Sequence, residues 1–211
     1  MRDPDTTDTD RGQAYTLEGF IAAMVVLMAL LFALQSVVIT PTTGGMADRT
    51  VQSQVQQETQ DALMIAADGA DDSENMSLSE TIRYWDDDED EFYNADPDQV
   101  HGAYNASNDS ELYTEAILAE VLTDRFTERG MSYNVELVYQ NESEYESEYL
   151  VYQGEAEAIT TSYTVTLYEN QTLTAPGQED TTIDEADHPI PRATDDSSVI
   201  YNVVEVRVAV W

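Results

Sequence analysis

The chain opens with a long apolar segment, and its hydrophobic period changes twice after that. Residues 19–39 contain no charged residue, and Gln35 and Ser36 are their only clearly polar members. About 20 residues, each rising 1.5 Å along a helix, span the roughly 30 Å hydrocarbon core of a bilayer. The pattern predicts a single transmembrane helix at residues 13–40, between a leader at residues 1–12 and a C-terminal domain at residues 41–211. A helix buried in a soluble core and a cleaved secretory signal remain alternatives.

A second helical pattern follows in residues 46–68. Apolar residues return at helical spacing among Gln and Glu, and they are Val51, Val55, Ala62, Leu63 and Ala66. This spacing predicts either a separate helix or a continuation of the first one past a break at Pro41 and Gly44-Gly45. Because the apolar stripe is thin, we expect this helix to lie on a sheet.

A third helix is predicted at residues 110–130. Its apolar face consists of Leu112, Ala116, Ile117, Ala119, Leu122 and Phe126. Ser110 is suited to the N-cap and Gly130 to the position just after the C-terminus. Arg125 and Arg129 would lie near the negative end of the helix dipole.

The hydrophobic period then becomes two, which is typical of strands. Alternation occurs in residues 131–140, 149–154, 158–170 and 197–211. In the last of these, Val204, Val206, Val208 and Val210 would face one side, and Glu205, Arg207 and Trp211 the other. Strands joined by polar turns without intervening helices predict an antiparallel sheet. The expected class is α+β: an N-terminal transmembrane helix with a helical continuation, then a helix and an antiparallel sheet that form the head of the molecule.

Residues 68–111 have the least regular pattern and contain six consecutive acids at residues 86–91. A calcium loop is one interpretation, but the block lacks the glycine and the alternating ligand spacing of an EF-hand. We therefore favour a solvated acidic loop. Trp85, Phe92 and Tyr93 on either side are expected to attach this loop to the domain.

The charge balance points to a salty environment. The chain has 8 Lys and Arg, all of them Arg, against 43 Asp and Glu, which gives a net charge of −35. Such a charge opposes compaction in dilute buffer, whereas at about 1 M salt the screening length falls to about 3 Å. The composition resembles that of haloarchaeal proteins. A chain this acidic repels the phosphate groups of nucleic acids. We therefore expect no nucleic-acid partner.

No feature of the sequence indicates catalysis. The chain has no cysteine, and both histidines, His101 and His188, lie in polar stretches. It contains no phosphate-binding glycine loop, no HExxH and no GxSxG. Acid pairs are so frequent that no single pair is informative. We therefore expect a non-enzymatic protein without a cofactor or a metal.

Sequons suggest which side of the membrane the domain occupies. Asn75, Asn105, Asn108, Asn141 and Asn170 each begin an N-x-[ST] triplet without proline in the middle, and they are five of the eight asparagines. Arginines flank both ends of the apolar segment, so the positive-inside signal is weak. The sequons favour a glycosylated domain outside the cell, on a single-pass protein of the cell membrane.

The start of the chain, Arg11-Gly12-Gln13 followed by "AYTLEGFIAAMVVLMALLFALQ", resembles haloarchaeal type IV pilin-like proteins with a class III, prepilin-type signal segment. The resemblance implies that a prepilin-type signal peptidase cuts after Gly12, so that Gln13 becomes the N-terminus. It also implies that Glu18 pairs with the terminal amine of a neighbouring subunit. In bacterial pilins the acid is the fifth mature residue, whereas Glu18 would be the sixth here, or the fourth if the cut followed Ala14.

The expected function is that of a pilin-like structural protein of the cell surface, as a subunit of a type IV pilus-like filament, with a minor subunit favoured over the main one. Its partners would be membrane lipid and other pilin-like subunits that pack through the N-terminal helix. The alternative is an uncleaved single-span membrane protein with a binding or sensory ectodomain.

Overall fold

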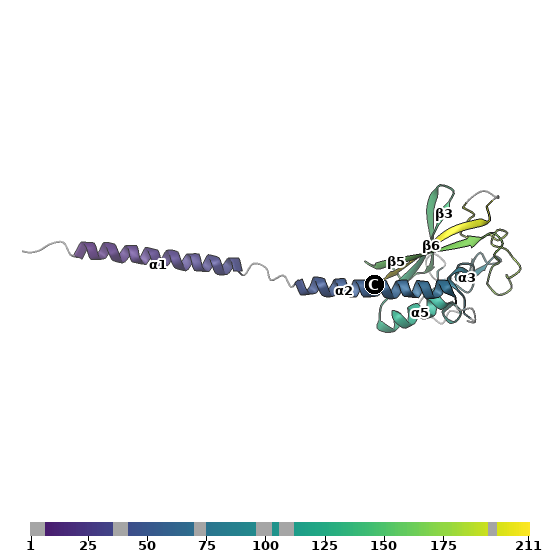
Figure 1. Ribbon diagram of the computed structural model, residues 1–211, viewed down its shortest axis with the longest axis horizontal. Coiled ribbons are helices and arrows are strands. Elements are labelled where there is room, and N and C mark those ends of the chain that lie inside the picture. Colours follow the sequence, from purple (N-terminus) through teal and green to yellow (C-terminus); the bar gives the residue numbers. More distant parts are fainter. Residues whose placement is uncertain (1–6, 36–41, 70–74, 96–102, 106–111, 194–197) are drawn as a thin grey trace, which may run out of the picture. The chain divides into compact units, whose positions relative to one another are not determined.

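A computed structural model describes residues 7–35, 42–69, 75–95, 103–105, 112–193 and 198–211 of the chain (Figure 1). The chain divides into two compact units, Met1–Arg49 and Thr50–Trp211. The first contains α1, Thr7–Gln35, and the start of α2, Thr42–Asp68. The second contains the rest of α2 and every other element. This division falls inside α2, a few residues after the predicted start of the C-terminal domain at residue 41.

The first helix carries apolar side chains on all sides. Every side chain in residues 15–31 is exposed, including those of Phe20, Met24 and Leu27. Among the residues that the structure describes, no helix is both long enough and apolar enough to cross a membrane. The predicted transmembrane segment, residues 13–40, includes residues 36–40, which lie outside the described residues.

The second helix confirms most of the predicted stripe. Val55, Ala62, Leu63 and Ala66 are buried, whereas Val51 is 57% exposed. Placing Val51 in the stripe was wrong, because the buried face of α2 begins one turn later, at Val55. The predicted break at Gly44-Gly45 is also wrong, since α2 runs through both glycines. Glycine costs about 1 kcal/mol relative to alanine inside a helix, which disfavours a helix without preventing it.

The predicted helix at residues 110–130 is interrupted. The structure has α4, Leu112–Glu115, then α5, Ile117–Arg125, and a 3-10 turn, Thr127–Arg129. Between α4 and α5, Ala116 is extended (φ −96°, ψ 122°), and the neighbouring Ile117 N–H donates to the Met76 carbonyl at 3.1 Å. The predicted apolar face is nevertheless buried as expected, and Gly130 adopts the left-handed conformation (φ 78°). Ser110 lies outside the described residues.

Four strands form the antiparallel sheet that the alternating pattern predicts. They are β3, Tyr133–Asn141, β4, Glu144–Val151, β5, Ile159–Tyr168, and β6, Ile200–Val210, in the spatial order β4-β3-β6-β5. The turn between β3 and β4 is short, with Glu142 in the left-handed region (φ 53°). Helices followed by this sheet confirm the α+β class.

Residues 75–95 are more ordered than the sequence suggests. A short helix, α3, Leu78–Ile82, starts with a capping box in which Ser77 and Glu80 bond reciprocally. The acidic block then forms a hairpin of β1, Trp85–Asp86, and β2, Glu91–Phe92, instead of the predicted loop. The Trp85 and Phe92 rings meet edge to face with centroids 5.2 Å apart, and both are buried. These rings attach the hairpin to the domain, as predicted.

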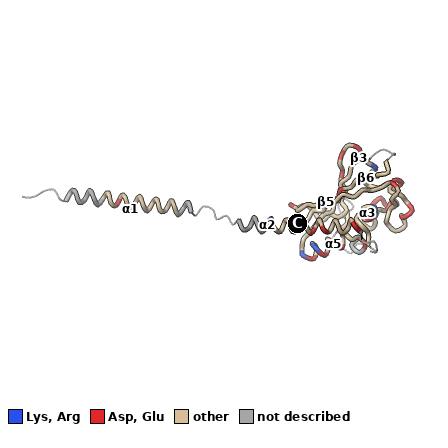
Figure 2. Tube along the Cα trace, in the orientation of Figure 1, with Lys and Arg blue, Asp and Glu red and all other residues tan. Residues whose placement is uncertain are grey.

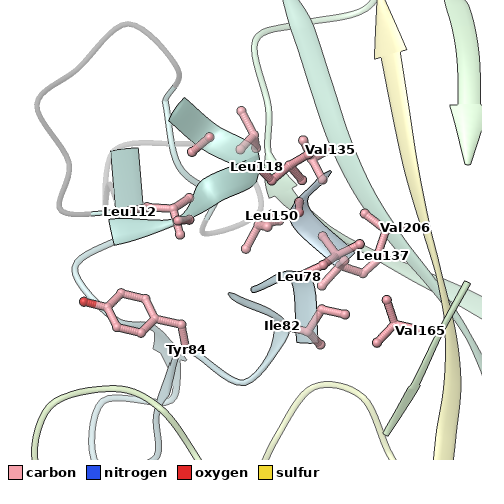
Figure 3. Close-up of a cluster of buried hydrophobic side chains, with 14 of the residues drawn as sticks. Leu78, Ile82, Tyr84, Leu112, Leu118, Val135, Leu137, Leu150, Val165 and Val206 are labelled. Carbon is pink, nitrogen blue, oxygen red and sulfur yellow. The ribbon is translucent and has the colours of Figure 1, made fainter. Parts of the chain in front are cut away.

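The core lies on one face of the sheet (Figure 3). Leu78 and Ile82 from α3 and Leu118 from α5 gather there with Leu137 and Val206 from the sheet, all at 2% exposure or less. Each fully buried side chain of this size contributes about 1.5–3 kcal/mol. The other face of the sheet is polar. On it, Arg207 is bonded to Glu136 at 3.1 Å and to Glu205 at 3.4 Å.

Candidate functional site

The residues that the pilin resemblance nominates lie on α1. Gly12 and Gln13 fall within the helical backbone of α1, after its first residue, Thr7. Glu18 is exposed, and so are its apolar neighbours Leu17 and Phe20. Glu18 is the only charged residue in residues 15–31, and Figure 2 shows that α1 is mostly tan, with red confined to a short stretch. One carboxylate therefore lies in the exposed segment of residues 15–31, which is otherwise uncharged.

The sequons belong to the second unit and differ in accessibility. Asn170 is exposed in the turn that follows β5. Asn141 lies at the end of β3, where its Nδ2 donates to Glu146 Oε2 at 2.9 Å. These two are the sequon asparagines nearest to turns between strands.

Asn75 and Asn105 are less exposed to solvent. Asn75 is half-buried, and its Nδ2 donates to Glu120 Oε2 at 2.9 Å. Asn105 is also half-buried, directly after the buried Tyr104. Asn108 and His101 lie outside the described residues.

A groove of about 890 Å³ runs between α2, α5 and the edge strand β5. Apolar side chains form its walls, among them Met64 at 53% exposure and Ile65 at 47% from α2, and half-buried Tyr163 from β5. Acids also line it, in particular Asp68, Glu120 and Asp124. Exposed apolar side chains in a groove are typical of a surface that another chain covers.

A second pocket, of about 470 Å³, lies beside the acidic hairpin. Trp85, Phe92 and His188 line it together with acids that include Glu91 and Asp187. Burial raises the pKa of the Glu91 carboxyl, and the neighbouring acids Glu89 and Asp86 raise it further. The sequence placed His188 in a polar stretch, but its ring is buried and packs against Trp85 with centroids 5.4 Å apart.

The hydrogen bonds of His188 fix its tautomer. Nε2 donates to the Ile82 carbonyl at 3.1 Å, and Nδ1 accepts from the Ile190 N–H at 3.1 Å. Burial, and more weakly the Arg83 charge, lowers the pKa of His188 to about 4. The ring is therefore neutral near pH 7 with both nitrogens engaged, and a base needs a free lone pair. This arrangement supports a structural role for His188.

Arg83 is a structural residue that the sequence pattern did not identify. It is 8% exposed, its Nε donates to the Ser79 carbonyl at 3.2 Å, and its Nη1 donates to the Thr172 carbonyl. Burial lowers its pKa, and the nearby Glu80 opposes that shift. The sequence feature that could have identified Arg83 is its position directly after α3, where a cation interacts favourably with the helix dipole.

A metal site needs several His, Asp or Glu side chains that converge on one point. Among the described residues, no three His, Asp or Glu side chains are grouped so that they could hold a metal ion. The two pockets are thus defined by aromatic, apolar and acidic side chains.

Comparison with known proteins gives a family. No curated protein and no solved structure matches the chain. Residues 11–210 match a family described as a family of unknown function, DUF7288. Because this match covers nearly the whole chain, including most of α1 and all four strands of the sheet, the protein belongs to the DUF7288 family.

Proposed function

We propose that this protein is a pilin-like structural protein of the cell surface. In this proposal α1 anchors it in the membrane, residues 50–211 lie outside the cell, and other pilin-like subunits pack against α1 in a filament. A prepilin-type signal peptidase would cut between Gly12 and Gln13. The role is structural, without catalysis or a cofactor.

The observation that carries the proposal is the exposure of α1. Its side chains from residue 15 to residue 31 are all exposed, and large apolar ones point in every direction around the helix. A helix that is apolar all round is stable only where other apolar groups surround it. Lipid and the helices of neighbouring subunits both supply that environment.

Glu18 supports assembly over a purely lipid environment. A carboxylate deep in hydrocarbon costs several kcal/mol unless it is paired. Cleavage after Gly12 would create an α-amino group near the start of the helix of each subunit. In a filament, the amine of one subunit could neutralise Glu18 of its neighbour, which is the pairing that the pilin resemblance implies.

The first test is intact-mass and N-terminal peptide analysis of protein purified from its own cells. We expect a chain that begins at Gln13, with the terminal glutamine open or cyclised. A Gly12→Val variant should keep its leader, because a bulky side chain blocks the small site that the peptidase requires. Gly19→Val is the matched control on the same helix, since no atom lies within 4 Å of the added Cβ.

The opposite result is equally clear. A mature chain that still begins at Met1 or Arg2 would contradict the proposal. It would favour the alternative, a permanently anchored membrane protein with a binding or sensory ectodomain.

A further inference from the structure

The two edges of the sheet differ in charge. β4 carries Glu144, Glu146 and Glu148, and its C-terminal end is covered by Tyr104, which bonds to the Leu150 carbonyl at 2.9 Å. β5, with the sequence ITTSYTVTLY, contains no charged residue, no proline and no glycine. In natural proteins, charged residues, prolines and bulges prevent edge strands from pairing with other chains. In β5 the only such device is an irregularity at its end, between Leu167 and Tyr168.

The hydrogen-bond pattern shows which groups of β5 face outward. Ser132 and Trp211 exchange two backbone bonds of 3.0 Å at the start of the β3–β6 ladder. Bonded and non-bonded pairs alternate along antiparallel strands, so the odd-numbered residues 205–209 of β6 point toward β3. The even-numbered residues 204–210 of β6 must then bond to β5, through their partners at odd positions 159–165. The even-numbered residues of β5 direct their N–H and C=O groups to the free edge.

Four residues form this outward row: Thr160, Ser162, Thr164 and Thr166. The first three are exposed and Thr166 is half-buried. In the described part of the chain, no hydrogen bond occupies their outward backbone groups. The row ends at Tyr168, whose N–H is bonded to Gln171 Oε1 at 2.9 Å. Residues 160–166 therefore present an open template for one more strand.

We propose that this edge pairs with β5 of a second copy of the chain, antiparallel and about a two-fold axis at Tyr163. In this register Thr160 lies opposite Thr166 of the second copy, and Ser162 lies opposite Thr164. Every outward group of residues 160–166 then has a partner. Tyr163 faces Tyr163 of the second copy as a non-hydrogen-bonded pair, where side chains approach most closely.

The absence of charge on β5 permits a second copy as the occupant of this edge. Two copies that each carry −35 repel one another, so they can meet only where acids are scarce, and β5 has none. Hydroxyl side chains on the outer face of β5 pair with one another without charge. The groove beside β5 adds apolar side chains next to this edge, because Met64, Ile65 and Tyr163 of each copy line it.

This pairing involves residues 159–168 and is independent of leader cleavage and of the environment of α1. Its failure and the failure of the pilin proposal are therefore distinguishable, since one is measured by cross-linking at β5 and the other by the mass of the N-terminus.

The chain has no cysteine, so single cysteines can test the register directly. The Tyr163→Cys variant of the full chain is oxidised in detergent at molar NaCl. The Thr166→Cys and Ser147→Cys variants are the controls. Cα atoms of a non-hydrogen-bonded pair lie about 4.5 Å apart, which a disulfide can span. In this register Thr166 of one copy lies far from Thr166 of the other copy. Ser147 lies on the other edge of the sheet, in β4.

We expect Tyr163→Cys to give at least about tenfold more disulfide-linked dimer than either control, because paired strands hold the thiols at millimolar effective concentration. Mixing Thr160→Cys with Thr166→Cys chains should also give a mixed dimer, and this second measurement stands if Tyr163→Cys fails to fold. Equal cross-linking of Ser147→Cys, self-linking of Thr166→Cys, or a monomer in every case would overturn the proposal.

A charge variant completes the test. Ser162→Glu combined with Thr164→Glu places like charges opposite one another across the axis, which destabilises strand pairing. Both side chains are exposed, so we expect the fold to persist and the circular dichroism spectrum to be unchanged. The same pair of substitutions in the Tyr163→Cys background should lower the yield of the disulfide dimer, and an unchanged yield contradicts the register.

Discussion

At the scale of single residues, His188 shows how the interior constrains protonation. Its neutral ring donates to Ile82 and accepts from Ile190, and burial lowers its pKa to about 4. In the unfolded chain the histidine pKa returns to about 6.5. Below that pH the unfolded chain binds a proton that the folded one does not bind, so the stability contributed by the neutral ring is lost as the pH falls.

We predict that the free energy of unfolding of the wild type falls by about 2 kcal/mol more than that of His188→Gln between about pH 7 and about pH 5. Glutamine retains one donor and one acceptor at this position but does not titrate. Urea unfolding at constant salt measures the difference. Because the carboxylates and His101 are common to both chains, their contributions cancel, and parallel pH profiles would contradict the assignment.

The sequence predicted some residues of the core and missed others for physical reasons. Trp85 and Phe92 flank an acidic run, so their role in attaching it could be inferred locally. The burial of His188 depends on Ile82, which lies 106 positions away in the chain, and no local pattern reports such a contact. Val51 likewise fits the helical spacing of the apolar stripe, yet it is exposed one turn before the buried Val55.

At the scale of elements, two arginines make a matched comparison. Arg83 is buried and ties α3 to the backbone of Thr172, whereas Arg129 forms an ion pair with Glu58 at 2.9 Å with its side chain 54% exposed. Removing a buried donor leaves carbonyls without a partner, while exposed ion pairs contribute about 0–1 kcal/mol.

We predict that Arg83→Met lowers the free energy of unfolding by about 2–3 kcal/mol, because the Thr172 and Ser79 carbonyls lose a charged donor. Arg129→Met should cost less than about 1 kcal/mol. Methionine keeps much of the apolar stem in both variants, and chemical denaturation at one salt concentration compares them. Similar losses for the two would show that Arg83 does not hold α3 to the Thr172 loop.

The elements were predictable where local periodicity decides, and less so where distant backbone intervenes. The faces of β3 and β6 follow from alternation alone, and the structure confirms them. The helix at residues 112–125 is broken at Ala116 because the backbone of Met76 pairs with it, 40 positions earlier in the chain. Leader processing and the pairing of Glu18 depend on an enzyme and on other subunits, so they stay predictions.

At the scale of the whole molecule, the order of strands was out of reach. Alternation shows that a segment is a strand but does not show its neighbours. A long connection after β5 lets β6 enter between β3 and β5, and this leaves the uncharged β5 at an edge. The free edge, and with it the proposed pairing surface, becomes visible only when the topology is known.

The charge of the whole molecule determines how its stability responds to salt. Asp and Glu outnumber Arg across residues 50–211, and Figure 2 shows acids spread over that unit. Few of these carboxylates are paired with a cation in the described residues, where ion pairs involve Arg129, Arg192 and Arg207. Repulsion between the remaining acids therefore favours unfolding, and salt screens it.

We predict that the Tm of residues 50–211 within the full chain rises with NaCl, most steeply between about 0.1 M and about 1 M, where the screening length falls from about 10 Å to about 3 Å. Near-ultraviolet circular dichroism of the buried tyrosines follows the transition. Sucrose is the control, because it stabilises through exclusion from the surface but screens no charge. A Tm that does not change with the NaCl concentration, or that rises equally in sucrose at low salt, would mean that repulsion among the acids does not limit stability. A steep rise in NaCl alone identifies charge screening as the condition for this fold, and the same screening would then allow two such acidic molecules to meet along β5.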